Sequence, residues 1–216
     1  MSVRVALIDS GVNANHPHLT ETGRVVVGPA IDAEGQLTDG AAGADVLGHG
    51  TAAGAAILHL APTAELVSIQ IFKEIPACPF EHVLAALDFA IREGFQLVNL
   101  SLGTTRHDWV GALEERIGRA QQSGTAIVAP ATFQGLPSFP GSLAGVHGVL
   151  MNARLEREAP TRQSHGERDY WYASPYPREL PNLPRESNLV GVSMSAANLT
   201  GWLARRIADG EAIPSA

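Results

Sequence analysis

The chain has little cysteine, no long apolar run and no excess of basic residues, and each absence excludes a class of protein. Cys78 is the only cysteine among 216 residues, so no internal disulfide can form, and a reducing compartment is expected. No apolar run approaches the roughly 20 residues that a membrane helix needs, and no signal peptide is recognisable. With a formal net charge of −7, no basic surface indicates nucleic-acid binding. We expect a cytoplasmic protein without nucleic-acid or membrane partners.

What the sequence does contain is an alternation of short apolar runs and amphipathic segments. Strands are expected at residues 3–9, 25–27, 65–72, 97–102, 126–129 and 149–152, and helices at residues 49–60, 80–93, 109–123 and 193–208. Continuous apolar runs are typical of buried parallel strands, and a 3.6-residue period is typical of helices packed on a sheet. This alternation predicts an α/β fold in three layers, with a mostly parallel central sheet and helices on both faces.

The domain organisation is expected to be simple. A chain of 216 residues with one continuous pattern predicts a single domain over residues 1–216. The pattern fails between residues 153 and 188, where the chain is charged, rich in proline and contains a Tyr-Trp-Tyr cluster at residues 170–172. We expect an irregular insertion or loop there, whose aromatic cluster either packs on the fold or contacts a substrate or partner.

Three short motifs place a carboxylate, an imidazole and a hydroxyl in the order Asp, His, Ser. Asp9 ends an apolar strand in Asp-Ser-Gly, His49 begins an alanine-rich helix in Gly-His-Gly-Thr, and Ser193 stands among small residues at the last helix. Each motif alone is more typical of a turn or a helix start. A serine attacks a carbonyl only when a base takes its proton and a carboxylate orients that base. We predict that Ser193 is the nucleophile, His49 the base and Asp9 the orienting carboxylate.

The motifs resemble those of the subtilase family of serine proteases. The resemblance extends from about residue 3 to residue 207 and includes Ala-Pro-Thr-Ala at residues 61–64, Val-Asn-Leu-Ser-Leu-Gly at residues 98–103 and Gly-Val-Ser-Met at residues 191–194. It implies a subtilisin-like fold, endopeptidase activity and a peptide or protein substrate.

The same resemblance implies residues for substrate binding. One strand end would pair with an extended peptide, main chain to main chain, and the next strand end would wall the pocket beside the scissile bond. The residues concerned are Ser101, Leu102, Gly103, Ala129, Pro130 and Ala131. No cofactor or metal is expected, because His16 and His18 have no third ligand near them in the sequence.

One departure from the family concerns the group that stabilises negative charge during attack. Relatives carry Ala-Gly-Asn after the strand near residue 128, and the asparagine donates to the oxyanion; here Phe133 stands in its place. Gln134 and Thr132 are the candidate replacements, beside the backbone N–H of Ser193, and the amide of Gln134 is the closer chemical substitute. Because loss of this donor costs about 10²- to 10³-fold in rate in subtilisin, we expect a slow or highly selective enzyme.

Several functions stay open at this point. The short chain, with no inhibitory prosegment in the sequence, resembles small subtilases that remove leader sequences, such as those associated with quinohemoprotein amine dehydrogenase assembly. That resemblance implies a modified precursor subunit as substrate. The alternative is a catalytically weak or inactive subtilase-fold module that binds a peptide strand, which Phe133 favours. An esterase or a peptide ligase could use the same triad.

Overall fold

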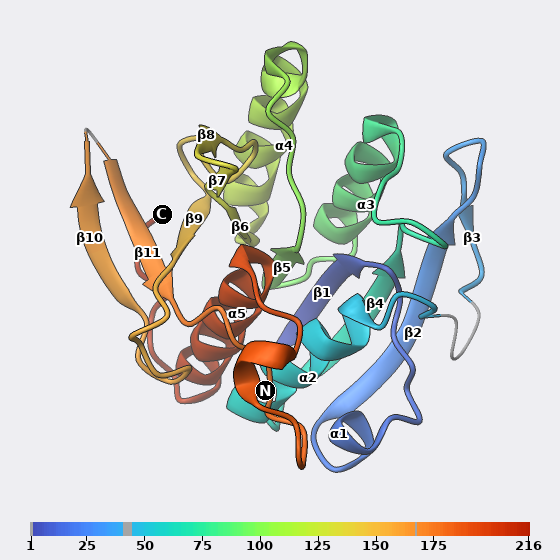
Figure 1. Ribbon diagram of the computed structural model, residues 1–216. Helices are drawn as coiled ribbons and strands as arrows, with labels where there is room; N and C mark the ends of the chain where they lie inside the picture. The colour runs from blue at the N-terminus through green and yellow to red at the C-terminus, as the bar shows by residue number, and fades with distance from the viewer. Residues whose placement is uncertain (1, 41–44, 167) are drawn as a thin grey trace.

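The computed structural model describes residues 2–40, 45–166 and 168–216. Within these residues a nine-stranded sheet crosses the molecule in the order β10-β11-β9-β6-β5-β1-β4-β2-β3 (Figure 1). The strands are β1 (Arg4–Asp9), β2 (Arg24–Ile31), β3 (Leu37–Thr38), β4 (Glu65–Gln70), β5 (Leu97–Leu100), β6 (Ala126–Pro130), β9 (His147–Met151), β10 (Thr161–His165) and β11 (Arg168–Ala173). Neighbours pair in parallel from β2 to β11, whereas the two edge pairs, β2–β3 and β10–β11, are antiparallel.

Helices cover both faces of this sheet. Helices α2 (His49–Leu60) and α5 (Val192–Ala208) pack on one face, and α3 (Phe80–Arg92) and α4 (Val110–Ser123) pack on the other (Figure 1). The short elements α1, η1 and η2 lie in connections and span Pro17–Thr20, His107–Trp109 and Arg185–Ser187. No helix in the described ranges is long and apolar enough to cross a membrane. The predicted three-layer α/β fold with a mostly parallel sheet is confirmed.

Strand β1 shows why the central strands are mostly apolar. Val5 and Leu7 belong to the core shared with α2 and α5, whereas Ala6 and Ile8 belong to the core shared with α3 and α4. All four side chains are fully buried. Because successive side chains of a strand point to opposite faces, a strand covered on both faces needs an unbroken apolar run.

Two glycines allow α2 to approach its neighbours closely. A Cβ atom on Gly50 would lie 2.0 Å from the carbonyl oxygen of Gly11, and one on Gly201 would lie 2.8 Å from that of Ile57. Any larger residue would push the start of α2 away from the end of β1, or α5 away from α2. The close approach brings the first turns of both helices to the carboxyl edge of the sheet.

The segment from residue 153 to 188 differs from its prediction. It contains β10 and β11, which extend the sheet at one edge, so the expected irregular loop is wrong for residues 161–165 and 168–173. Trp171 is 6% exposed and packs on Trp202 with ring centroids 5.4 Å apart, so the Tyr-Trp-Tyr cluster belongs to a strand. The residues of β10 are polar, which suits an exposed edge strand. Because they lack apolar periodicity, the sequence pattern does not predict this strand.

A separate hairpin follows β6. It is formed by β7 (Thr132–Phe133) and β8 (Leu136–Pro137), which pair antiparallel. Gln134 and Gly135 make its turn, with φ of +50° and +80°. Positive φ at both central residues is the requirement of a type I′ hairpin turn. The hairpin thereby reverses the chain within two residues.

Candidate active site

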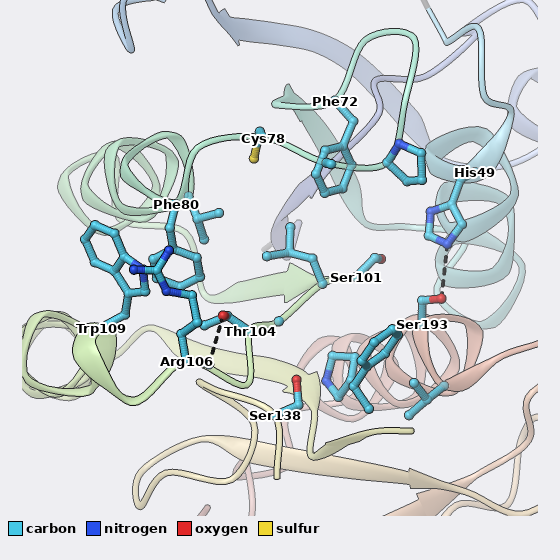
Figure 2. Close-up of a pocket in the computed structure, with 18 of the residues that line it drawn as sticks. His49, Phe72, Cys78, Phe80, Ser101, Thr104, Arg106, Trp109, Ser138 and Ser193 are labelled. Carbon is cyan, nitrogen blue, oxygen red and sulfur yellow. Dashed lines mark hydrogen bonds between the residues drawn. The ribbon is translucent and has the colours of Figure 1, made fainter. Parts of the chain in front are cut away.

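The three motif residues lie together at the carboxyl edge of the sheet. Asp9 ends β1, His49 begins α2 and Ser193 is the second residue of α5. His49 Nδ1 lies 2.8 and 2.9 Å from the two carboxylate oxygens of Asp9, and His49 Nε2 lies 3.1 Å from Ser193 Oγ. Figure 2 shows the contact between His49 and Ser193 at one end of a cavity. The structure therefore brings the three predicted side chains into one hydrogen-bonded chain.

The chemistry of these groups fixes where the protons lie. An ionised carboxylate can only accept, so His49 Nδ1 carries the proton and donates it to Asp9. Nε2 is then unprotonated and accepts from the Ser193 hydroxyl. In this tautomer the imidazole can take the serine proton, and Asp9 is placed to stabilise the imidazolium that results.

A second carboxylate, Asp45, ties this chain to the backbone, and sequence reasoning missed it. Its Oδ1 accepts from Ser10 Oγ at 2.7 Å and from the Gly48 N–H at 2.9 Å, and its Oδ2 accepts from the Thr51 N–H at 2.7 Å. Ser10 Oγ accepts in turn from the Gly50 N–H at 2.9 Å. Asp45 therefore joins the end of β1 to the first turn of α2. A carboxylate just before a helix start is a capping signal that could have revealed it.

The surroundings of His49 favour its role as a base. Burial alone would lower the pKa of His49, but the hydrogen bond to Asp9 and the negative charges of Asp9 and Asp45 outweigh it and raise that pKa above its usual value. Asp9 itself is fully buried and also accepts from the Ser10 N–H at 2.6 Å. The imidazole is thus strengthened as a proton acceptor by two carboxylates held in place.

A cavity of about 780 Å³ opens beside Ser193 and His49. Of the residues predicted to bind substrate, four line it: Ser101, Leu102, Gly103 and Pro130. Ala129 and Ala131 differ from their prediction, because both are buried and neither lines this cavity. Ala129 instead packs in the core beneath α3 and α4, since alternate residues of β6 must face the two cores.

The two oxyanion candidates are placed differently. Thr132 lines the cavity together with Ser193, whereas Gln134 is exposed at the hairpin turn and does not line it. Phe133 also lines the cavity and is 57% exposed, and its ring offers no donor. The first N–H groups of α5, at Ser193, have no partner within the helix and lie at its positive end. Geometry therefore favours Thr132 over Gln134 as the side chain near a developing negative charge.

The far end of the cavity is aromatic. Phe80 and Trp109 lie with ring centroids 5.1 Å apart, and the Arg106 guanidinium stands 5.9 Å from the centroid of the Trp109 ring (Figure 2). Cys78 also lines the wall, and burial raises the pKa of its thiol to about 11. A thiol with that pKa stays protonated at neutral pH and is a poor nucleophile. This end of the cavity therefore suits apolar side chains rather than chemistry.

His16 and His18, the two histidines considered as metal ligands, lie with their rings 5.1 Å apart. Burial, followed by the nearby positive charges of Arg178 and His16, lowers the pKa of His18. Across the parts of the chain that the structure describes, no group of three or more His, Cys, Asp or Glu side chains is placed to hold a metal ion.

Comparison with known proteins connects this site to a family. Residues 1–143 match the sequence profile of the Subtilase family, a stretch that includes Asp9 and His49 and ends before Ser193. Thermitase of Thermoactinomyces vulgaris is 24% identical over 216 residues, which cover 92% of this chain and 72% of thermitase. Subtilisin DY of Bacillus licheniformis is 29% identical over 140 residues, which cover 60% of this chain and 47% of that protein. The chain thus spans about half the length of subtilisin DY.

Solved structures show the same fold. The prenylagaramide maturation protease PagA is 19% identical to this chain, with a TM-score of 0.68 over 97% of this chain and 78% of PagA. At this identity the likeness concerns the arrangement of helices and strands. The family match, by contrast, covers well over half of the sequence. The chain belongs to the subtilase family.

Proposed function

We propose that this protein is a serine endopeptidase that hydrolyses a peptide bond through Asp9, His49 and Ser193. The observation that carries the proposal is the hydrogen-bonded chain from Asp9 through His49 Nε2 to Ser193 Oγ at 3.1 Å. His49 and Ser193 line a cavity of about 780 Å³, a volume within the usual range for ligand sites. Nucleophile, base and a place for the substrate are therefore together.

The reaction follows from the proton positions. Ser193 Oγ attacks the carbonyl carbon of the scissile bond while His49 Nε2 takes its proton, and the imidazolium is stabilised by Asp9. The carbonyl oxygen gains negative charge near the first N–H groups of α5 and the hydroxyl of Thr132. The C–N bond then breaks as His49 returns the proton to the leaving amine. Water, deprotonated by His49, hydrolyses the acyl-enzyme, and Ser193 regains its proton.

The substrate that fits this site is an extended peptide with apolar side chains. The cavity runs from Ser193 past residues 101–103 to the aromatic end at Phe80 and Trp109 (Figure 2). Backbone groups beyond a strand end can pair with an extended peptide, and the aromatic end favours a large apolar side chain at a distance from the scissile bond. The aromatic end is therefore the part of the cavity that selects the substrate side chain.

We also propose that the physiological substrate is a modified precursor peptide that this protein trims. PagA, whose name describes a maturation protease for prenylagaramide, shares the fold, and that role supports this assignment. The cytoplasmic location expected from the sequence belongs to the same proposal. Incubation with precursor peptides encoded beside its gene, followed by mass spectrometry, tests it: one defined leader is removed, whereas random cleavage or no cleavage of every precursor contradicts it.

The endopeptidase proposal itself is tested with a mixture of synthetic peptides. New peptide termini, detected by mass spectrometry, appear with the wild-type protein and do not appear with Ser193→Ala. Products that carry water distinguish hydrolysis from ligation, which would join two peptides instead. A folded wild-type protein that yields no new termini in any peptide would contradict the proposal.

A second candidate function is peptide binding without cleavage. Phe133 favours it, because this exposed ring lines the cavity where relatives place a donor to the oxyanion. The two candidates differ in turnover: a binding module retains peptides unchanged in the presence of an intact Ser193, whereas the endopeptidase releases two products.

A further inference from the structure

A buried polar network lies behind Ser101, and the inference drawn from it rests on the proposed function. Asn99 Nδ2, in β5, donates to Ser101 Oγ at 2.8 Å. Thr200 Oγ1, in α5, donates to Asn99 Oδ1 at 2.9 Å and lies equally far from the carbonyl oxygen of Ala196. Asn99 and Thr200 are fully buried, whereas Ser101 lines the cavity. The network therefore leads from the interior of α5 to the substrate side of the sheet.

The hydrogen bonds of this network run in one direction. Asn99 Oδ1 faces the Thr200 hydroxyl and can only accept from it, although that hydroxyl shares its proton with the carbonyl oxygen of Ala196. Asn99 Nδ2 is thereby turned toward Ser101. Ser101 Oγ then serves as an acceptor, and its own proton is not used by the network. Figure 2 shows the Ser101 hydroxyl directed toward the end of the cavity that holds His49 and Ser193. One donor is thus aimed at the place where a peptide lies during attack.

Stability alone gives no reason to place this network in the core. A typical buried hydrogen bond contributes about 1 kcal/mol net, and apolar side chains of the same shape can replace both partners at little cost. What apolar side chains cannot do is fix the rotation of a neighbouring hydroxyl. The effect unique to the Asn99–Thr200 pair is therefore the orientation of Ser101.

We propose that Ser101 is a substrate-binding residue whose hydroxyl donates to a backbone carbonyl of the bound peptide, and that Asn99 and Thr200 are positioning residues that aim it. Thr200 lies seven residues after Ser193 on α5, about two helical turns. The network therefore sets the peptide-binding hydroxyl in register with the helix that carries the nucleophile. The ligand recognised is the peptide main chain, whatever its side chains.

Two probes separate this role from a structural one. A small fluorophosphonate reacts with Ser193 and presents no peptide, whereas an apolar tetrapeptide p-nitroanilide must occupy the cavity. We expect Ser101→Ala to lower kcat/KM for the p-nitroanilide about fivefold, the usual worth of one hydrogen bond, mainly through KM. The rate of fluorophosphonate labelling should stay within twofold of the wild type.

Thr200→Val should give the same pattern with a smaller loss, and Thr200→Ser, which restores the hydroxyl, should recover the wild-type KM. The matched control is Thr125→Val, because Thr125 is also buried and its hydroxyl bonds to Ser123 Oγ at 3.1 Å, outside this network. That control should leave both rates unchanged. Thermal unfolding of each variant verifies that the comparison is made between folded proteins.

Two results would overturn the proposal. One is an equal loss of labelling and peptide hydrolysis in Thr200→Val, since Thr200 would then act by placing the helix of Ser193. The other is unchanged peptide hydrolysis in Ser101→Ala. If the wild type is not labelled at all, the endopeptidase proposal fails instead. The inference is then tested by the affinity of the tetrapeptide, which Ser101→Ala should still weaken about fivefold. An unchanged affinity would contradict the inference.

Discussion

The Asp9–His49 side of the cavity and the β7–β8 hairpin face the same space, yet they are built in opposite ways. On the first side Asp9 is fully buried, and Asp45 accepts hydrogen bonds from three residues at the end of β1 and the start of α2. On the second side Phe133 and Leu136 are each 57% exposed. A group with several buried partners is fixed by the fold, whereas an exposed hairpin is fixed mainly by its own turn. Proton transfer is thus prearranged more firmly than oxyanion binding.

The largest loss of activity is expected when the base is removed from the Asp9–His49 side of the cavity. His49→Ala should lower kcat for peptide hydrolysis by about 10⁴- to 10⁶-fold, the range measured in subtilisin when triad members are removed. Steady-state hydrolysis of a peptide p-nitroanilide measures it, and His165→Ala, an exposed histidine of β10, is the control. A variant that keeps a tenth of the activity would show that another group acts as the base.

On the hairpin side the expected effect is a gain. Phe133→Asn supplies the amide donor that relatives place here, and kcat should rise about 10²-fold, the lower end of the 10²- to 10³-fold that such a donor is worth. KM should change little, because the donor acts on charge that develops in the transition state. Phe133→Ala, which removes the ring without adding a donor, is the control. Equal rates for the two variants would show that no oxyanion lies within reach of this position.

The hairpin also offers a contrast between its two candidate donors. Thr132→Val, which removes a hydroxyl that lines the cavity, should lower kcat about 10²-fold, as expected for the loss of one donor to the oxyanion. Gln134→Ala, at the exposed turn, should leave kcat within twofold. The same p-nitroanilide assay measures both. A larger loss of kcat for Gln134→Ala than for Thr132→Val would show that Gln134, and not Thr132, donates to the oxyanion.

A smaller effect is expected from the second carboxylate on the buried side. Asp45 contributes to the raised pKa of His49, so Asp45→Asn should lower that pKa. Because His49 must be unprotonated to act as a base, the acid limb of the pH–rate profile should move to lower pH. At the pH where the wild type is half-active, the rate of the Asp45→Asn variant should exceed that of the wild type by at most about twofold. Asp39→Asn, an exposed carboxylate, is the control, and a limb that moves to higher pH would contradict the account.

The smallest effect on activity at neutral pH is expected at His147, a buried histidine outside the site. Burial, followed by the positive charge of Arg162, lowers its pKa to about 4, and its Nδ1 accepts from Trp171 Nε1 at 3.3 Å. The unfolded chain, with a pKa near 6.5, binds the proton more readily. Stability is therefore complete above about pH 6.5 and should fall by up to about 3 kcal/mol between pH 6.5 and 4.

Urea unfolding at several pH values tests this prediction. His147→Gln should remove that part of the pH dependence, because glutamine does not titrate. An unchanged slope between pH 6.5 and 4 would contradict it. His49 differs from His147. Burial alone would lower the pKa of both imidazoles, but the two carboxylates beside the partly exposed His49 reverse the direction of its shift.

The parts of the fold and site that sequence predicts are those where one local pattern fixes a position. Asp9 ends an apolar run, and His49 and Ser193 start helices among small residues, so their meeting at one sheet edge follows from strand–helix alternation. The strands and helices of both cores show clear periods for the same reason. The positions of the triad residues and of the core strands and helices thus follow from sequence patterns that are each about ten residues long or shorter.

The features that sequence reasoning missed lack such a pattern. Asp45 lies in a stretch rich in glycine and alanine without periodicity, and β10 is a polar edge strand. Its amide makes Gln134 the closer chemical substitute for asparagine, but Gln-Gly between two short strands is also compatible with a tight turn, which is what the chain forms. The backbone geometry of the hairpin, which the sequence pattern does not specify, leaves Thr132 and not Gln134 at the cavity.

The central claim is that Ser193 is an activated nucleophile, and stoichiometric labelling tests it most directly. The folded protein is incubated with a fluorophosphonate, and intact and peptide mass spectrometry locate the adduct. The account predicts one adduct per chain, on Ser193, with none on Ser193→Ala and greatly slowed labelling on His49→Ala. A folded wild-type protein that stays unlabelled, or carries the adduct on another residue, would contradict it.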